Sequence, residues 1–84
     1  MKLSIIIPVF NEERTIIHIL KKINDNLIIK ENYEVIVVND ASSDKTGELL
    51  DKNKNLYDKI IINSSNKGKG YSVKKGLEQA SGTH

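Results

Sequence analysis

The sequence predicts an open α/β fold, in which the strands of a parallel sheet alternate with helices in the order βαβαβα. Three apolar segments at residues 3–9, 34–39 and 59–63 are rich in β-branched residues, which is typical of strands in a parallel sheet. Each is followed by a segment with helical spacing of apolar residues, as right-handed crossovers require. With 84 residues, the chain is expected to hold one small domain or a piece of a larger one.

The first strand reads Leu-Ser-Ile-Ile-Ile-Pro-Val, and Pro8 is expected to end its pairing because proline has no N–H to donate. Asn11 is the expected N-cap of the first helix, with Glu12 and Glu13 in its first turn. The helix should end within residues 26–32. Its apolar stripe, which should pack on the sheet, consists of Ile16, Leu20, Ile23 and Leu27, widened by Ile17, Ile19 and Ile28.

The second and third units repeat this arrangement. After the strand at 34–39, residues 40–44 form a turn that can cap a helix from about 44 to 53, although Gly47 disfavours that helix by about 1 kcal/mol relative to alanine. The strand at 59–63 carries three isoleucines in a row. The last helix is expected to close near Gly82, and its buried side is predicted from Val73, Leu77 and Ala80.

Composition excludes several classes of function. No cysteine is present, so thiolate metal sites and thiol nucleophiles are excluded, and a reducing, cytoplasmic location is expected. Thirteen basic against eleven acidic residues are too balanced for binding nucleic acid by bulk charge. No apolar segment approaches the roughly 20 residues of a membrane span. His18 has no acidic or histidine partner at metal-ligand spacing, which favours a surface imidazole over a metal ligand.

Function is expected at the carboxyl ends of the strands, because open α/β sheets bind ligands in the crevice outside those ends. The three loops there span residues 8–13, 39–44 and 63–70. The first has no glycine, which disfavours a dinucleotide-binding turn, and the chain has no P-loop motif. No residue stands out as a general base, and no catalytic residue is predicted.

Each loop nevertheless offers groups that suit a nucleotide, beside a simpler structural interpretation. Phe10 could stack on a base, or it could be a hydrophobic staple on the first helix. Asp40 could accept a hydrogen bond from a base or a ribose, whereas Asp44 is better explained as a helix cap. The segment Lys67–Gly70 combines two lysines with two glycines at a helix start and suits a phosphate, although lysines are usually just solvated.

Three motifs in this order resemble the family 2 glycosyltransferases, and the chain is most similar to their dolichyl-phosphate mannosyltransferase and undecaprenyl-phosphate sugar transferase branch. The motifs are Ile5-Ile6-Ile7-Pro8-Val9-Phe10-Asn11-Glu12-Glu13, Val35 to Thr46, and Asn66-Lys67-Gly68-Lys69-Gly70. The resemblance covers the whole chain. Two departures are mild: Asn39 stands where aspartate is commoner, and Ala41 where glycine is commoner.

The resemblance implies the N-terminal, nucleotide-binding half of a GT-A, or Rossmann-like, fold that transfers a sugar from a UDP-sugar or GDP-sugar with Mg²⁺ or Mn²⁺. Pro8 and Phe10 correspond to residues that line the base pocket, and Glu12 to an acid that faces the nucleotide. Asp40 corresponds to the acid that contacts base or ribose. Lys67 and Lys69 correspond to the loop near which the nucleotide is held.

The family's Asp-x-Asp metal motif, catalytic base and acceptor site would come after the last helix and are absent from residues 1–84. We therefore expect a truncated domain that does not transfer sugar by itself. A polyprenyl-phosphate acceptor, and membrane association through such a lipid, are implied only by likeness to the branch. In the resembled fold a further strand pairs with the first one, so its free edge should favour self-association or a second polypeptide that supplies the rest.

Two alternatives stay open. The chain could be a non-catalytic nucleotide-binding or interaction module, a remnant of a split or decayed gene. It could instead be a flavodoxin-like regulatory domain, although the acidic cluster expected at the end of the first strand is missing. Loss of nucleotide binding on Asp40→Ala would distinguish the glycosyltransferase hypothesis from the regulatory one.

Overall fold

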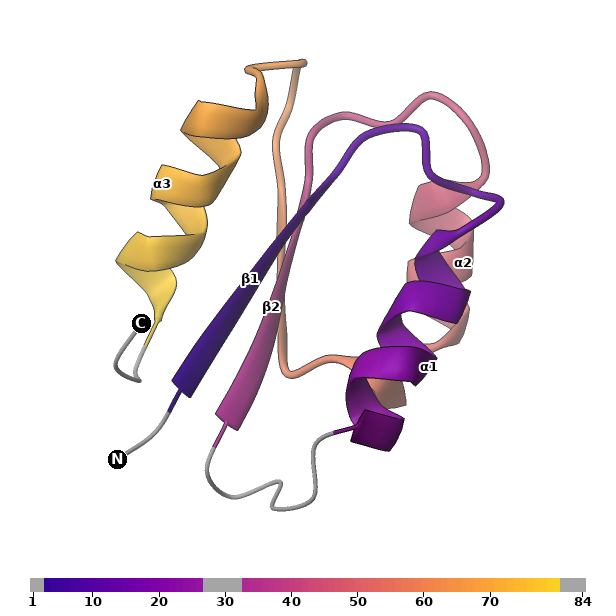
Figure 1. Cartoon of the computed structure of the whole chain (residues 1–84). Coiled ribbons are helices and arrows are strands. Elements are labelled where there is room, and N and C mark those ends of the chain that lie inside the picture. The colour runs from indigo at the N-terminus through magenta and orange to yellow at the C-terminus, as the bar shows by residue number, and fades with distance from the viewer. Residues whose placement is uncertain (1–2, 27–32, 81–84) are drawn as a thin grey trace.

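A computed structural model of the chain describes residues 3–26 and 33–80, and it confirms the predicted open α/β fold. Helices and strands alternate along these residues, with one additional short 3₁₀ helix before the last strand (Figure 1). The elements are β1 (Leu3–Val9), α1 (Ile16–Asn26), β2 (Tyr33–Asn39), α2 (Thr46–Lys52), η2 (Lys54–Leu56), β3 (Lys59–Ile62) and α3 (Lys69–Gln79).

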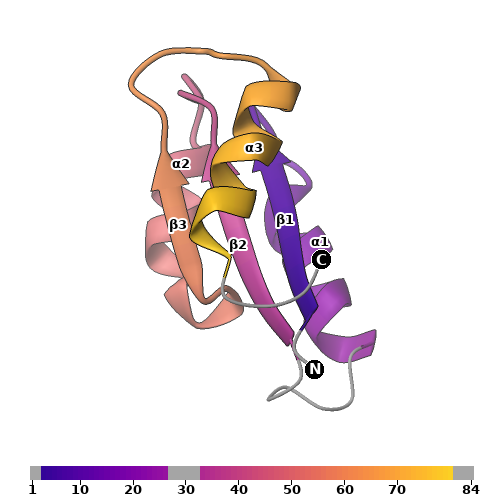
Figure 2. The ribbon, with the colours of Figure 1, turned by 90° about the vertical axis from the view of Figure 1, so that its left-hand side faces the viewer.

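The sheet has the order β1-β2-β3, and both pairings are parallel. Helices α1 and α2 cover one face and α3 covers the other, as Figures 1 and 2 show. Because successive side chains of a strand point to opposite faces, Val35 and Val37 face α1 and α2, whereas Val38 faces α3. Strand β2 is therefore buried over its whole length, and it forms the centre of the molecule.

The main core lies between the sheet and the helices α1 and α2. The predicted apolar stripe of α1 is confirmed for Ile16 and Leu20, which are fully buried, and for Ile17 and Ile23, which pack against the core. It is wrong for Ile19, which is 40% exposed because it lies on the side of the helix away from the sheet; Leu27 and Ile28 lie outside the described residues. Burying one such side chain contributes about 1.5–3 kcal/mol. The buried apolar residues of this cluster are Val9, Ile16, Leu20, Tyr33, Val35, Val37 and Leu50.

Burial of every strand on both faces, expected from the sequence, holds only for β2. Strands β1 and β3 are the two edges of the sheet, and both are only partly buried. Pro8 does not end the pairing of β1, because the register with β2 continues to the pair Val9 and Asn39. Proline is tolerated there since an edge strand pairs on one side only.

The prediction that Asn11 caps α1 is wrong. Asn11 has a left-handed backbone with φ of 52°, whereas an N-cap residue usually has extended backbone angles. Its side chain instead accepts a hydrogen bond from the N–H of Ser43 in the loop after β2. Helix α1 begins at Ile16, so Glu12 and Glu13 precede it rather than forming its first turn. Helical bonding nevertheless starts at the carbonyl of Glu12, which accepts a hydrogen bond from the N–H of Ile16 at 2.8 Å.

The predicted cap of the second helix is confirmed in part. Asp44 Oδ1 accepts a hydrogen bond from the N–H of Thr46, the first residue of α2, at 2.9 Å. Helix α3 begins at Lys69, earlier than its apolar residues suggested, and Gly82 lies outside the described residues. Its predicted buried side is wrong for Leu77, which is 36% exposed, because α3 packs on the sheet through the small residues Ser72 and Gly76. None of the described helices has the length and apolar character needed to cross a bilayer.

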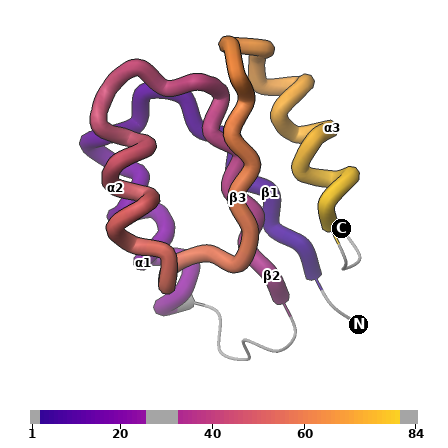
Figure 3. The backbone as a smooth tube through the Cα atoms, turned by 180° about the vertical axis from the view of Figure 1, so that it is seen from behind, coloured from indigo at the N-terminus to yellow at the C-terminus, as the bar shows by residue number. Residues whose placement is uncertain are grey.

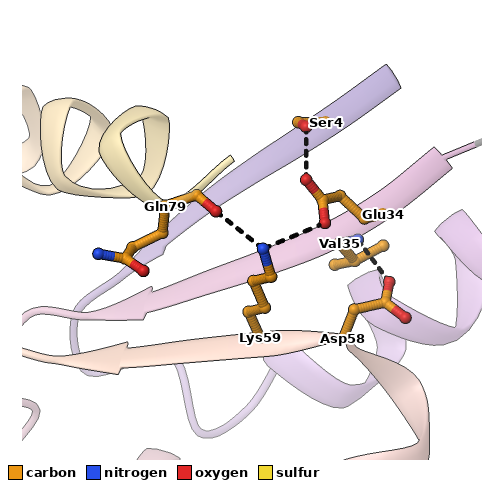
Figure 4. Close-up of polar contacts among 6 residues, drawn as sticks. All are labelled: Ser4, Glu34, Val35, Asp58, Lys59 and Gln79. Carbon is orange, nitrogen blue, oxygen red and sulfur yellow. Dashed lines mark hydrogen bonds and ion pairs between the residues drawn. The ribbon is translucent and has the colours of Figure 1, made fainter. Parts of the chain in front are cut away.

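A polar network ties the sheet together near the amino ends of its strands (Figure 4). The buried Glu34 on β2 accepts a hydrogen bond from Ser4 on β1 at 2.8 Å and pairs with Lys59 on β3 at 3.6 Å. Lys59 Nζ also donates to the carbonyl of Gln79 at the end of α3. This network connects all three strands and α3, and it leaves the opposite end of the sheet free for the loops described next.

Candidate functional site

The loops that follow β1, β2 and β3 gather at the carboxyl end of the sheet, at the top of Figures 1 and 3. Parallel strands in neighbouring positions necessarily bring these loops together, and the order β1-β2-β3 places the loop after β2 between the other two. Hydrogen bonds between residues far apart in the sequence then fix their conformations.

The first and second loops are joined by reciprocal hydrogen bonds. Asn11 Oδ1 accepts from the backbone N–H groups of Ser43 and Asp44, at 2.8 and 3.3 Å. In return, the N–H of Asn11 donates to Ser42 Oγ and the N–H of Glu12 to Thr46 Oγ1. The left-handed backbone at Asn11 turns its side chain toward the second loop, a conformation that asparagine tolerates better than most residues.

The second and third loops are joined by the carboxylate of Asp40, which is only 4% exposed. Its Oδ1 accepts from Asn63 Nδ2 and from the N–H of Lys67, both at 2.8 Å. Its Oδ2 accepts from the N–H of Gly68, also at 2.8 Å, where a φ of 92° favours glycine. The hydrogen bond from Asn63, followed by those from Lys67 and Gly68, lowers the pKa of Asp40 against the opposing effect of burial.

Asp44 joins the first loop to the start of α2 by a similar device. Its Oδ2 accepts from the N–H of Glu13 at 3.3 Å while its Oδ1 holds the N–H of Thr46. Burial alone would raise the pKa of Asp44, but the hydrogen bonds from Thr46 and Glu13 together lower it. Both aspartates are therefore ionised at neutral pH, and the loops are held by charge-assisted hydrogen bonds.

A cavity of about 210 Å³ opens between the first loop, the end of β2 and the start of α3. Its floor is the buried Asp40 and Ser72, and its rim carries the ring of Phe10, which is 45% exposed. Phe10 does not belong to the core cluster of the described residues, which favours the stacking interpretation over the hydrophobic staple. The residues that line the cavity are Pro8, Val9, Phe10, Glu12, Asp40, Lys69 and Ser72.

The structure thus gathers five of the six predicted nucleotide-binding residues around one cavity, namely Pro8, Phe10, Glu12, Asp40 and Lys69. Their part in binding stays a prediction. Lys67 lies elsewhere: its backbone N–H holds Asp40, and it lines a separate hollow of about 340 Å³ with Tyr71 and Lys75.

Two residues of this site were missed by the sequence analysis. Ser72 lies three positions after Lys69, so both lie on the same side of α3, and this spacing could have revealed it. Asn63 is the first residue after β3 and is 9% exposed. No local pattern marks it, because its partners Asp40 and Ser72 come from different elements.

The described residues do not form a metal site by themselves. Among them no group of three or more His, Asp or Glu side chains is arranged to hold a metal ion. Glu12 and Asp40 supply the two carboxylates at the cavity, and the oxygens of the Asp40 carboxylate already accept three hydrogen bonds.

The protein-family model for glycosyl transferase family 2 matches residues 4–84 of the chain. Among curated proteins, a dolichol-phosphate mannosyltransferase of Pyrococcus furiosus is 37% identical over 98% of the chain. An undecaprenyl-phosphate 4-deoxy-4-formamido-L-arabinose transferase of Proteus mirabilis is 34% identical over 96% of it. The chain spans only 23% and 26% of the length of these two proteins.

Solved structures show the same fold. Staphylococcus aureus TarS 1–349 in complex with UDP-GlcNAc superposes with a TM-score of 0.86 at 32% identity, over 98% of this chain and 24% of that one. A mannosyltransferase of Pyrobaculum calidifontis in complex with GDP-Man and Mn²⁺ gives a TM-score of 0.85 at 24% identity, over 95% of this chain and 24% of that one. The second likeness shows the fold alone.

Proposed function

Because the chain belongs to glycosyl transferase family 2, we propose that its cavity binds the nucleotide of a nucleotide-sugar donor, as part of an enzyme that transfers the sugar. One observation carries the proposal: an exposed aromatic ring, a buried carboxylate and an ammonium group meet around one cavity at the carboxyl end of the sheet. The likeness to TarS with bound UDP-GlcNAc supports the same assignment.

Each of these groups suits a different part of a nucleotide. The half-exposed ring of Phe10 offers a face on which a base can stack. A carboxylate has about four acceptor positions, and the three hydrogen bonds to Asp40 leave about one for a base N–H or a ribose hydroxyl. Lys69 at the start of α3 brings positive charge toward a diphosphate, where the helix dipole adds to it.

The cavity is smaller than a complete donor site. Small-molecule sites usually measure about 300–1,000 Å³, compared with about 210 Å³ here. We infer that this segment holds the base and ribose, and that sugar, acceptor and catalytic groups depend on residues outside it. A divalent ion, Mg²⁺ or Mn²⁺, is proposed for the whole enzyme from the family resemblance, and a polyprenyl phosphate for its acceptor, with the dolichol-phosphate relative as support.

The proposal includes a partner surface on β1. This strand pairs with β2 on one side, and no other described strand pairs with its opposite edge. An unpaired edge with Ile5, Ile6 and Ile7 is a template for a further strand from a second polypeptide or a second copy. The same edge is the observation that favours the alternative function, a non-catalytic interaction module.

Equilibrium binding of UDP and GDP to the full chain and to Phe10→Ala tests the function. Loss of a stacked base costs about 1–3 kcal/mol, so the variant should bind about 5-fold to 150-fold more weakly. Tyr71→Ala is the matched control, because Tyr71 is similarly exposed at 41% but lines a different hollow. Equal affinity of Phe10→Ala and the wild type would refute base stacking at this cavity.

A further inference from the structure

Asn63 is the buried polar residue on which the floor of the cavity depends. It follows β3 directly, and its backbone N–H donates to the carbonyl of Asn39 at 2.9 Å. Its side-chain Nδ2 donates to Asp40 Oδ1 at 2.8 Å and to Ser72 Oγ at 3.2 Å. A single amide therefore uses both of its N–H groups to join the end of β2 to α3.

The side-chain amide of Asn63 helps to fix the orientation of the Asp40 carboxylate. Asp40 Oδ1 receives two hydrogen bonds, from Asn63 and Lys67, and Oδ2 receives one, from Gly68. With these donors in place, the carboxylate cannot rotate, and the acceptor position that remains belongs to Oδ2. Ser72, fully buried beneath the cavity, is held by the same amide.

We propose that Asn63 is a positioning residue of the nucleotide site, which orients the Asp40 carboxylate so that its remaining acceptor position is available to a bound base or ribose. This inference rests on the proposed function. Asn63 itself does not line the cavity, so its effect on a ligand passes through Asp40 and Ser72. An amide suits this place because it donates at every pH, whereas an acid would donate only when protonated.

The variant Asn63→Asp tests this difference between an amide and an acid as hydrogen-bond donors. It places a second carboxyl group about 3 Å from Asp40, and two carboxylates at that distance cannot both ionise without strong repulsion. At low pH the shared proton restores a hydrogen bond, and at high pH repulsion drives Asp40 out of position. The other charged groups that face this pair are Glu12 from the first loop, Lys67 from the third loop and Lys69 from α3.

The experiment measures the affinity of the full chain for UDP and GDP at pH 5 and pH 8, with an amide correlation spectrum at each pH to report folding. The wild type should bind its preferred nucleotide with affinities that agree within about threefold. Asn63→Asp should bind within about threefold of the wild type at pH 5 and at least about tenfold more weakly at pH 8. A role in folding alone would not give recovery of affinity at low pH.

Asn53→Asp is the matched control, because Asn53 Nδ2 also donates a hydrogen bond, to the carbonyl of Leu49, but at the end of α2. It should bind like the wild type at both pH values. If Asn63→Asp is unfolded at pH 8, Asn63→Ala is measured in its place. It is expected to bind about tenfold more weakly than the wild type at both pH values.

The outcomes separate the two proposals. If the wild type binds and Asn63→Asp has equal affinity at pH 5 and pH 8, the positioning role is overturned and the proposed function stays intact. The same holds if the wild type binds and Asn63→Ala binds as tightly as the wild type. Failure of the wild type to bind either nucleotide would overturn the proposed function and, with it, the positioning role.

Discussion

Asp40 holds two loops together at the cavity that is proposed to bind a nucleotide. A carboxylate that faces a ligand in a shallow site would ordinarily be exposed, but Asp40 is buried and anchors the third loop through two backbone N–H groups. The same three hydrogen bonds that hold the loop keep the carboxylate ionised and fixed. The site is thus expected to be ordered before any ligand binds.

This anchoring predicts a pH dependence of stability. Because the pKa of Asp40 is lowered in the folded chain, its contribution is present above the ordinary aspartate pKa of about 3.9 and is lost as pH falls through the lowered value. Asp40→Asn should therefore have a lower urea unfolding midpoint than the wild type at pH 7, and the difference should shrink below about pH 4. Asp51→Asn, at an exposed ion pair, should change the midpoint little.

A midpoint difference that stays constant between pH 7 and pH 3 would contradict this account of Asp40. It would mean that the hydrogen bonds to the carboxylate are not specific to its ionised form. The chemical shifts of the Lys67 and Gly68 amides provide a second measurement, because they should change over the same pH range as the urea unfolding midpoint.

At the scale of elements, the packing of α3 against the sheet depends on Gly76. This glycine is buried, and a Cβ at its position would lie 2.4 Å from Ile6 Cγ2 and 3.4 Å from Val38 Cγ2. Carbon atoms approach to about 3.5–4.0 Å, so no side chain fits unless Ile6 or the helix moves. The absence of a side chain sets how closely this helix covers β1 and β2.

Gly76→Ala should therefore destabilise the fold by about 1–3 kcal/mol through overpacking, even though alanine favours a helix by about 1 kcal/mol. The control is Gly70→Ala in the first turn of the same helix, where a Cβ would meet nothing within 4 Å. That variant should be neutral or more stable by up to about 1 kcal/mol. Denaturant unfolding checks both, and equal stability of the two variants would refute the packing argument.

The start of α1 shows where local patterns fail. The sequence places a good cap residue before an apolar stripe, yet Asn11 accepts hydrogen bonds from Ser43 and Asp44, more than thirty positions away. Such a contact exists only once the sheet has brought the two loops together. The apolar stripe itself predicted the helix correctly, because periodicity depends on neighbours three and four residues apart.

At the scale of the whole molecule, the order of elements and the gathering of the loops could be predicted from the sequence. Both follow from period-2 and period-3.6 patterns and from the geometry of parallel sheets. The contacts of Asn63 could not be predicted, because its partners Asp40 and Ser72 come from different elements. The partial burial of β1 and β3 was not predicted either, because an apolar run looks the same in an edge strand and in a central strand. The assignment of nucleotide-contacting residues depended on the family resemblance and stays a prediction.

The free edge of β1 predicts association of the full chain. Leu3 at the start of this edge strand is 49% exposed, so Leu3→Lys should weaken association with little effect on the fold, because charges at strand edges oppose pairing. Ile19→Lys on α1, where the side chain is 40% exposed and lies on no strand edge, is the control and should leave association unchanged. Sedimentation at several concentrations checks this, and a wild type that is monomeric at all of them would contradict it.

A nucleotide is proposed to bind in the cavity between the first loop, Asp40 and α3. The most direct test is a ¹⁵N–¹H correlation spectrum of the full chain, titrated with UDP and then with GDP. We expect dispersed resonances and saturable shifts at Phe10, Asp40 and residues 67–70 with one of the two nucleotides. A folded chain whose resonances respond to neither nucleotide, or only at sites away from this cavity, would contradict it.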